Sequence, residues 1–129
     1  MPSRFWFLTI TSLIAIGVGG TALIAPHLML ASKGIVGNAA AQVWMQEVGV
    51  LLLAVGVIGW LVRSHQDSAT LRALLWGNGL LQLALLPIEV LAHLHGVIPH
   101  VAGIVPNTAL HALLAVGFVN YARAVRVGH

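Results

Sequence analysis

Polar side chains recur on one face of a long apolar segment in the second half of the chain. At about 100° per residue in an α-helix, four of them fall within a sector of about 60°: Asn78, Gln82, Glu89 and His93. A polar or ionisable group at membrane depth is costly unless it is paired or neutralised, so we expect this stripe to face protein or water. No Lys or Arg lies at the depth of Glu89 in its own segment, so its carboxyl group must be protonated or bonded to a His, Asn or Gln side chain.

Two other apolar segments bring polar residues to a similar depth. Asn107 and His111 are four residues apart at the start of the last segment, so they share a helix face. An earlier segment carries Gln46 and Glu47, and Glu47 and Glu89 each lie about 5–7 residues, or roughly 8–10 Å, inside the same membrane boundary. That half of the molecule should hold two of the three acids and five of the seven histidines. We interpret this asymmetry as the mark of a functional site.

We expect these side chains to perform acid–base chemistry on a lipophilic small molecule. A carboxyl group in an apolar pocket can donate or accept a proton near neutral pH. Glu89 and Glu47 are predicted as the acid and the base, and His93 and His111 would orient them or relay protons. Isomerisation, cyclisation or epoxide opening would fit this set, and none of these reactions needs a cofactor. Ligand contacts are expected from polar and aromatic neighbours: Asn78, Gln82, Gln46, Asn107 and Trp44.

A metal or haem site is a second interpretation of the same residues. Two histidines and one carboxylate suit Zn, Cu or Fe, and His93, His111 and Glu89 supply such a set. The two histidines, on neighbouring helices, could also ligate a haem iron. The spacing matches no compact metal-binding motif such as His-Glu-x-x-His. The sequence itself does not identify a cofactor.

Two further interpretations involve no reaction. The stripe could form a path for protons or solutes, which in so small a chain would require an oligomer. Alternatively, the polar groups could only fix helix packing in a structural subunit of a membrane complex. Single residues also have simpler roles: Asn107 is well placed to cap a helix, and Trp44 to anchor a span in the headgroup region. Gln82 and Asn78 could hydrogen-bond across helices.

Four apolar segments must position these residues. The 129-residue chain is 59% hydrophobic and 7% charged, with a mean hydropathy of +0.97, so it lacks the charged surface of a soluble domain. Each segment has about the 20 apolar residues needed to cross a bilayer, and the boundaries fall near 5–25, 42–62, 70–95 and 106–124. This predicts a single all-α integral membrane domain over residues 1–129, an antiparallel bundle of four transmembrane helices. Gly49 and Gly56, seven residues apart, predict a close helix contact.

The charges beside these segments predict an orientation. One side carries only Lys33, whereas the other carries five arginines: Arg4, Arg63, Arg72, Arg123 and Arg126. The side rich in Arg is expected to be cytoplasmic, which places both termini inside, and we expect the bacterial cytoplasmic membrane.

The composition also limits the partners and the chemistry. The basic residues are scattered singly, which argues against nucleic-acid binding. The expected partners are the lipid bilayer, a lipophilic small molecule, and a further copy of the chain or a subunit of a membrane complex. The chain has no cysteine, which excludes disulfides, thiolate catalysis and cysteine-ligated metals.

The layout resembles the broad class of small bacterial four-helix membrane proteins that includes the DoxX-like families. The likeness rests on the helix count, the Ala25-Pro26-His27 end of the first segment, the acid early in the second, and the Pro106-Asn107-x-x-x-His111 start of the fourth. It covers most of the chain at the level of layout and implies an association with quinone or redox enzymes. It assigns no role to any residue here, and a shared layout does not establish a shared function.

Overall fold

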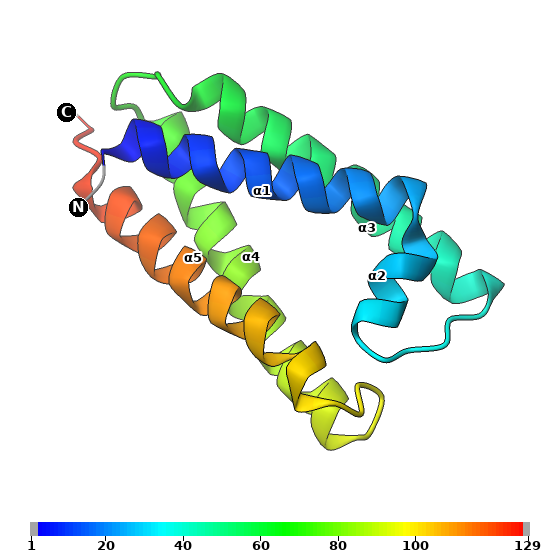
Figure 1. Ribbon diagram of the computed structural model, residues 1–129. Helices are drawn as coiled ribbons and strands as arrows, with labels where there is room; N and C mark the ends of the chain where they lie inside the picture. Colours follow the sequence, from blue (N-terminus) through cyan, green and yellow to red (C-terminus); the bar gives the residue numbers. More distant parts are fainter. Residues whose placement is uncertain (1–2, 128–129) are drawn as a thin grey trace.

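The structure is a computed structural model that describes residues 3–127, and in this range the chain is helical and contains no strand. Residues 1, 2, 128 and 129 of the predicted domain lie outside the described part. In chain order the helices are α1 (Arg4–Ile24), α2 (Pro26–Ser32), α3 (Ala39–Val62), α4 (Ala69–Leu94), the 3-10 helix η1 (Val101–Gly103) and α5 (Val105–Ala124), as Figure 1 shows. The helices α1, α3 and α4, and η1 together with α5, are long and apolar enough to cross a membrane. The four predicted segments are confirmed as helices.

Side-chain caps fix where two of the long helices begin. Asn38 Oδ1 accepts a hydrogen bond from the Ala41 N–H at 2.9 Å, and Ser68 Oγ accepts one from the Leu71 N–H at 3.1 Å. Each cap satisfies a backbone donor that has no partner within its helix. The Asn38 cap starts α3 three residues before the boundary predicted at residue 42.

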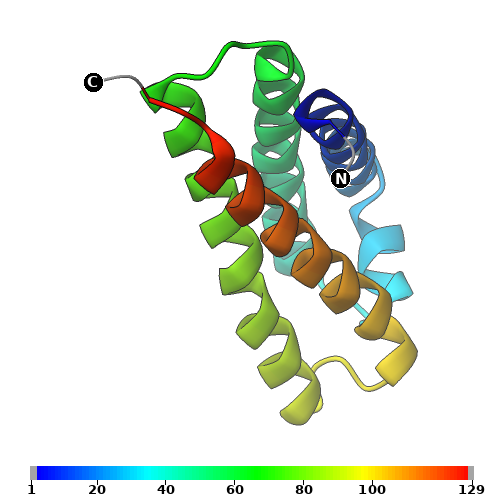
Figure 2. The same cartoon turned by 90° about the vertical axis from the view of Figure 1, so that its left-hand side faces the viewer.

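The long helices pack as two pairs. α1 packs along α3, and α4 packs along α5. The pairs converge at the end of the molecule where the two termini lie (Figures 1 and 2). Glycines bring α1 and α3 close together, because a Cβ on Gly49 would lie 2.7 Å from the backbone nitrogen of Leu23, and one on Gly56 would lie 3.0 Å from that of Ile16. The close contact predicted from these two glycines is confirmed.

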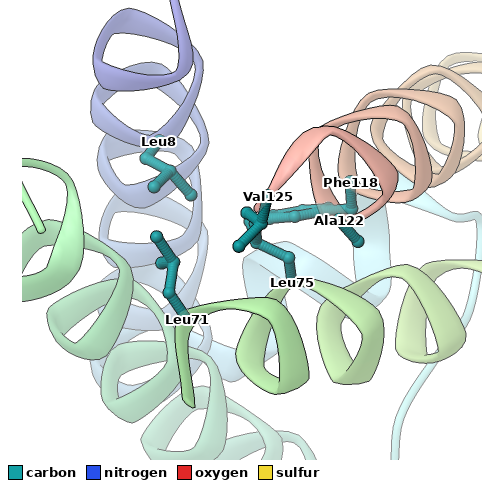
Figure 3. Close-up of a cluster of buried hydrophobic side chains, with 6 residues drawn as sticks. All are labelled: Leu8, Leu71, Leu75, Phe118, Ala122 and Val125. Atoms are coloured by element: carbon teal, nitrogen blue, oxygen red, sulfur yellow. The ribbon is translucent and has the colours of Figure 1, made fainter. Parts of the chain in front are cut away.

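An apolar core joins the two pairs where they converge. Phe7 of α1 packs edge-on against Phe118 of α5, with 5.0 Å between the ring centroids. The buried members of this core come from α1, α4, α5 and the residue after α5: Leu8, Leu71, Leu75, Phe118, Ala122 and Val125 (Figure 3).

At the opposite end, the segments that connect the helices bridge the two pairs. Gly34, which follows α2, has a φ of 75°, a conformation that favours glycine, and it lies against Pro99 and His100. Gly103 of η1 packs on the Lys33 backbone so closely that a Cβ there would lie 3.1 Å from the Lys33 Cα. Lys33 is therefore held at the boundary between the pairs.

Candidate functional site

The carboxyl group of Glu89 is the centre of a polar cluster that joins both helix pairs. Glu89 lies on α4 and is 8% exposed. Its Oε1 accepts a hydrogen bond from Lys33 Nζ at 3.2 Å and one from the Asn107 amide, and its Oε2 accepts one from Thr108 Oγ1 at 2.9 Å. A carboxylate that would be isolated in its own helix thus has one cation and two neutral donors around it.

The Asn107 amide links Glu89 to a histidine. Asn107 Nδ2 carries two protons, and it lies within hydrogen-bond distance of both Glu89 Oε1 and His111 Nε2, the latter at 3.2 Å. On its other side, His111 Nδ1 is 2.5 Å from Gln82 Oε1. Since an amide oxygen can only accept, these partners assign the proton to Nδ1 and the acceptor role to Nε2. His111 is therefore a neutral imidazole with both nitrogens hydrogen-bonded.

The charges of the cluster are balanced. Lys33 and Glu89 form an ion pair, and their side chains are 19% and 10% exposed. The His111 side chain is 14% exposed, with Nε2 3.9 Å from the nearer Glu89 oxygen. A proton gained by His111 would place a positive charge directly beside the carboxylate, which would stabilise it electrostatically.

The cluster faces a cavity that lies between the two helix pairs. The cavity has a volume of about 240 Å³ and is lined by residues of all four long helices. Such a volume greatly exceeds the roughly 10–15 Å³ that a single water needs, and a cavity of about 150 Å³ can hold benzene in another protein. Most of the lining side chains are apolar. The polar ones are Thr11, Ser12, Lys33, Asn78, Gln82, Glu89, Asn107 and His111.

One polar atom in the cavity wall has no partner within the described chain. Ser12 of α1 is 2% exposed, and its Oγ makes no hydrogen bond. Buried hydroxyl groups nearly always have a partner, so an unpaired one calls for an explanation. The Oγ lies against Gly59 of α3, where an added Cβ would be 2.5 Å from it, so this hydroxyl is enclosed at the contact between α1 and α3.

The structure brings together only part of the set predicted from the sequence. Gln82, Glu89, Asn107 and His111 meet, and Asn78 lines the same cavity while its amide donates to the Leu74 carbonyl of its own helix at 2.9 Å. Asn107 does not cap α5, because the cap position is occupied by Ile104.

The other predicted residues lie elsewhere. His93 Nδ1 is 2.7 Å from the Ile98 carbonyl oxygen, so the ring holds the chain after α4 instead of joining Glu89. Glu47 and Trp44 are exposed on α3, and neither lines the cavity. Gln46 donates to the Leu23 carbonyl at 3.2 Å, which ties α3 to α1. Within residues 3–127, no three His, Asp or Glu side chains approach one another closely enough to hold a metal ion.

Three residues of the site were not predicted. Lys33 had been considered only as the single cation on its side of the membrane, yet it is the charge partner of Glu89. The single cation and the two acids expected at the same boundary were the available signal for such a pair. Thr108 and Ser12 carry no comparable signal, since hydroxyl groups are common in membrane helices, where they bond to the backbone.

No protein-family model, no curated protein sequence and no solved structure matches this chain.

Proposed function

We propose that the four long helices cross a membrane as an antiparallel bundle, with both termini in the cytoplasm of a bacterial cell. The proposal is supported by their length and apolar composition and by the five arginines that flank them on one side. Single cysteines can be introduced without background, because the native chain has none. A cysteine in place of Val36 should react with an impermeant thiol reagent added to whole cells, whereas one in place of Ser64 should not. The reverse pattern would overturn this orientation.

We further propose that the cavity binds a lipophilic small molecule on which the chain performs acid–base chemistry. The observation that carries this proposal is the chain of hydrogen bonds from Glu89 through Asn107 and His111 to Gln82, all four of which line one apolar cavity. Ligand sites commonly combine apolar walls with a few convergent polar groups. The residue roles differ from those expected from sequence, because Glu47 and His93 lie outside this cluster.

His111 is the proton carrier in this proposal, and Glu89 is its electrostatic support. A substrate group that replaces the Asn107 amide at Nε2 would give its proton to that nitrogen and leave an imidazolium ion 3.9 Å from the carboxylate. Return of the same proton to another atom of the substrate completes an isomerisation without a net gain or loss of protons. Gln82 accepts the hydrogen bond from Nδ1–H, so Nε2 is the nitrogen that takes up the proton and then returns it.

Proton transfer can be tested before the substrate is identified. The purified chain is incubated in deuterated water with a total lipid extract of the membranes in which it is made, and the extract is analysed by mass spectrometry. We expect at least one component to gain deuterium or to change into an isomer with the native chain, and not with His111→Gln. His95→Gln is the matched control, since His95 is exposed and does not line the cavity. An extract left unchanged by the native chain, or changed equally by His111→Gln, would contradict acid–base chemistry at this site.

A further inference from the structure

A second, outward-facing hollow lies at the end of the molecule where the two helix pairs converge. The first turns of α4 and the last turns of α5 form it, and these two segments lie side by side in Figures 1 and 2. Its lining residues are Ala69, Arg72, Ala73, Trp76, Ala122 and Arg123. None of these residues lines the cavity of the Glu89 cluster, so the two sites are separate.

Two arginines in this hollow have no partner for their charge. The Arg72 and Arg123 side chains are exposed, and within residues 3–127 neither guanidinium group makes a hydrogen bond, an ion pair or a ring contact. Other basic residues do have partners: Arg4 pairs with Asp67, and the Arg63 guanidinium lies 3.8 Å from the centre of the Trp60 ring. The hollow is therefore lined by two positive charges that no neighbouring group of the described residues neutralises.

The rest of the hollow is small and apolar, apart from one indole. Three of its lining residues are alanines, whose small side chains occupy little of the space. One of them, Ala122, is fully buried. Trp76 lies four residues after Arg72, so it is on the same helix face about 6 Å deeper in the span, and it is 42% exposed. An indole at this depth suits the region between headgroups and acyl chains, where its N–H can donate and its ring can pack.

We propose that this hollow binds the phosphodiester headgroup of an anionic phospholipid. Guanidinium groups match phosphate oxygens in geometry and charge, and basic pockets between transmembrane helices are suited to lipid headgroups. Arg72 and Arg123 would hold the phosphate, and Trp76 would pack on the glycerol and the first carbons of the acyl chains. This inference requires that the chain spans a bilayer, but it is independent of any ligand in the central cavity.

Native mass spectrometry of the full chain tests the proposal directly. The protein is released from mixed micelles that contain equal amounts of phosphatidylglycerol and phosphatidylcholine, and the bound lipids are counted. We expect a preference for phosphatidylglycerol. Arg72→Gln and Arg123→Gln should each weaken its binding about five-fold, since each removes a direct hydrogen bond between a guanidinium group and the phosphate, and one hydrogen bond contributes about that factor. Trp76→Ala should weaken binding of both lipids.

Arg63→Gln is the matched control, because it removes the same charge at the same end of the molecule outside the hollow. It should leave phosphatidylglycerol binding unchanged. An equal loss in Arg63→Gln would mean general surface charge and would overturn the site, as would the absence of any lipid preference. Inorganic phosphate at a large excess should fail to displace the lipid, and full displacement would show that the hollow takes the free anion instead. Unchanged helix content in all variants, measured by circular dichroism, confirms that each is folded.

Discussion

At the residue scale, the Lys33–Glu89 pair explains how an acidic side chain can be 8% exposed in an apolar helix. Transfer of a carboxylate out of water is costly, and a single opposite charge seldom offsets that cost by itself. Here the two donors Asn107 and Thr108 complete the set of hydrogen bonds to both oxygens. Lys33 follows α2 and Glu89 lies on α4. The ion pair therefore connects two helices that otherwise make few contacts with each other.

A double-mutant cycle measures this interaction. Lys33→Met and Glu89→Gln should each lower the free energy of unfolding by about 1–3 kcal/mol, because each leaves a mostly buried partner without its hydrogen-bonded charge. The double variant should be less destabilised than the sum of the two, with a coupling energy of about 1 kcal/mol or more. Unfolding in mixed detergent micelles, followed by circular dichroism, gives the four values. Additive effects would show that the two side chains do not interact.

Sequence reasoning at this scale found the acid but not its partner. Helix periodicity places residues on one face of one helix, so it identified Gln82 and Glu89 as inward-facing. It contains no information about which distant segment covers that face. Lys33 is 56 residues away from Glu89, and it reaches the carboxylate only because α2 and η1 fold over the end of the cavity.

At the element scale, the contact between α1 and α3 depends on glycine. Gly49→Ala should lower the free energy of unfolding by about 1–3 kcal/mol, since the new Cβ would lie 2.7 Å from the Leu23 backbone and the helices would have to separate. Gly20→Ala is the control in the same helix pair, because nothing lies within 4 Å of its Cβ position. That variant should be neutral or stabilising by up to about 1 kcal/mol. Equal effects of the two substitutions would contradict the close approach.

Three parts of the chain meet at Asp67, in the connection between α3 and α4. Its carboxylate accepts hydrogen bonds from the Arg4 side chain and, at 2.8 Å, from the Arg126 backbone N–H. The Arg4 hydrogen bond, followed by the one from Arg126, holds the pKa of Asp67 below its ordinary value of 3.8. A carboxyl group with a lower pKa in the folded chain stabilises the fold above its unfolded pKa, and this stabilisation is lost as the pH falls through the folded value.

The unfolding temperature should therefore fall on acidification below about pH 4, and it should fall less steeply in Asp67→Asn, which cannot titrate. Unfolding followed by circular dichroism from pH 6 to pH 3 measures both slopes. Parallel curves for the native chain and Asp67→Asn would show that the hydrogen bonds from Arg4 and Arg126 to this carboxylate do not stabilise the fold.

The long helices were predictable because about 20 consecutive apolar residues form a strong signal over several turns. The seven residues of α2 are too few to show a period of their own, so the segment was expected only as part of a loop. Asn107 shows a further limit. Its type and position suit a helix cap, but the competing carboxylate of Glu89 is visible only once α4 and α5 are packed together.

At the scale of the whole molecule, the arrangement in two pairs creates the cavity. The pairs meet in an apolar core at one end and through Lys33, Glu89 and the η1 segment at the other, with the cavity between them. Hydropathy and periodicity predict that four helices exist and which faces turn inward. They do not predict that α1 packs on α3 and α4 on α5 while the pairs diverge, because this depends on close contacts such as the one at Gly49.

The most direct test of a ligand-binding site is whether the central cavity holds a small molecule in the purified protein. Val55 lines the cavity, whereas Val57, two residues further along α3, is 47% exposed and does not. Val55→Trp should fill the cavity, and Val57→Trp adds the same side chain to the outer surface. The native chain and both variants are purified in mild detergent, and the bound molecules are extracted and identified by mass spectrometry.

We predict that the native chain and Val57→Trp carry the same lipophilic molecule and that Val55→Trp has lost it. The amount of phospholipid bound at the Arg72–Arg123 hollow should be the same in all three proteins. An equal amount shows that the substitution acts on the central cavity and not on the hollow. A native chain that carries no such molecule, or a Val55→Trp variant that carries as much of it as the native chain, would contradict a ligand-binding cavity at the Glu89–His111 cluster.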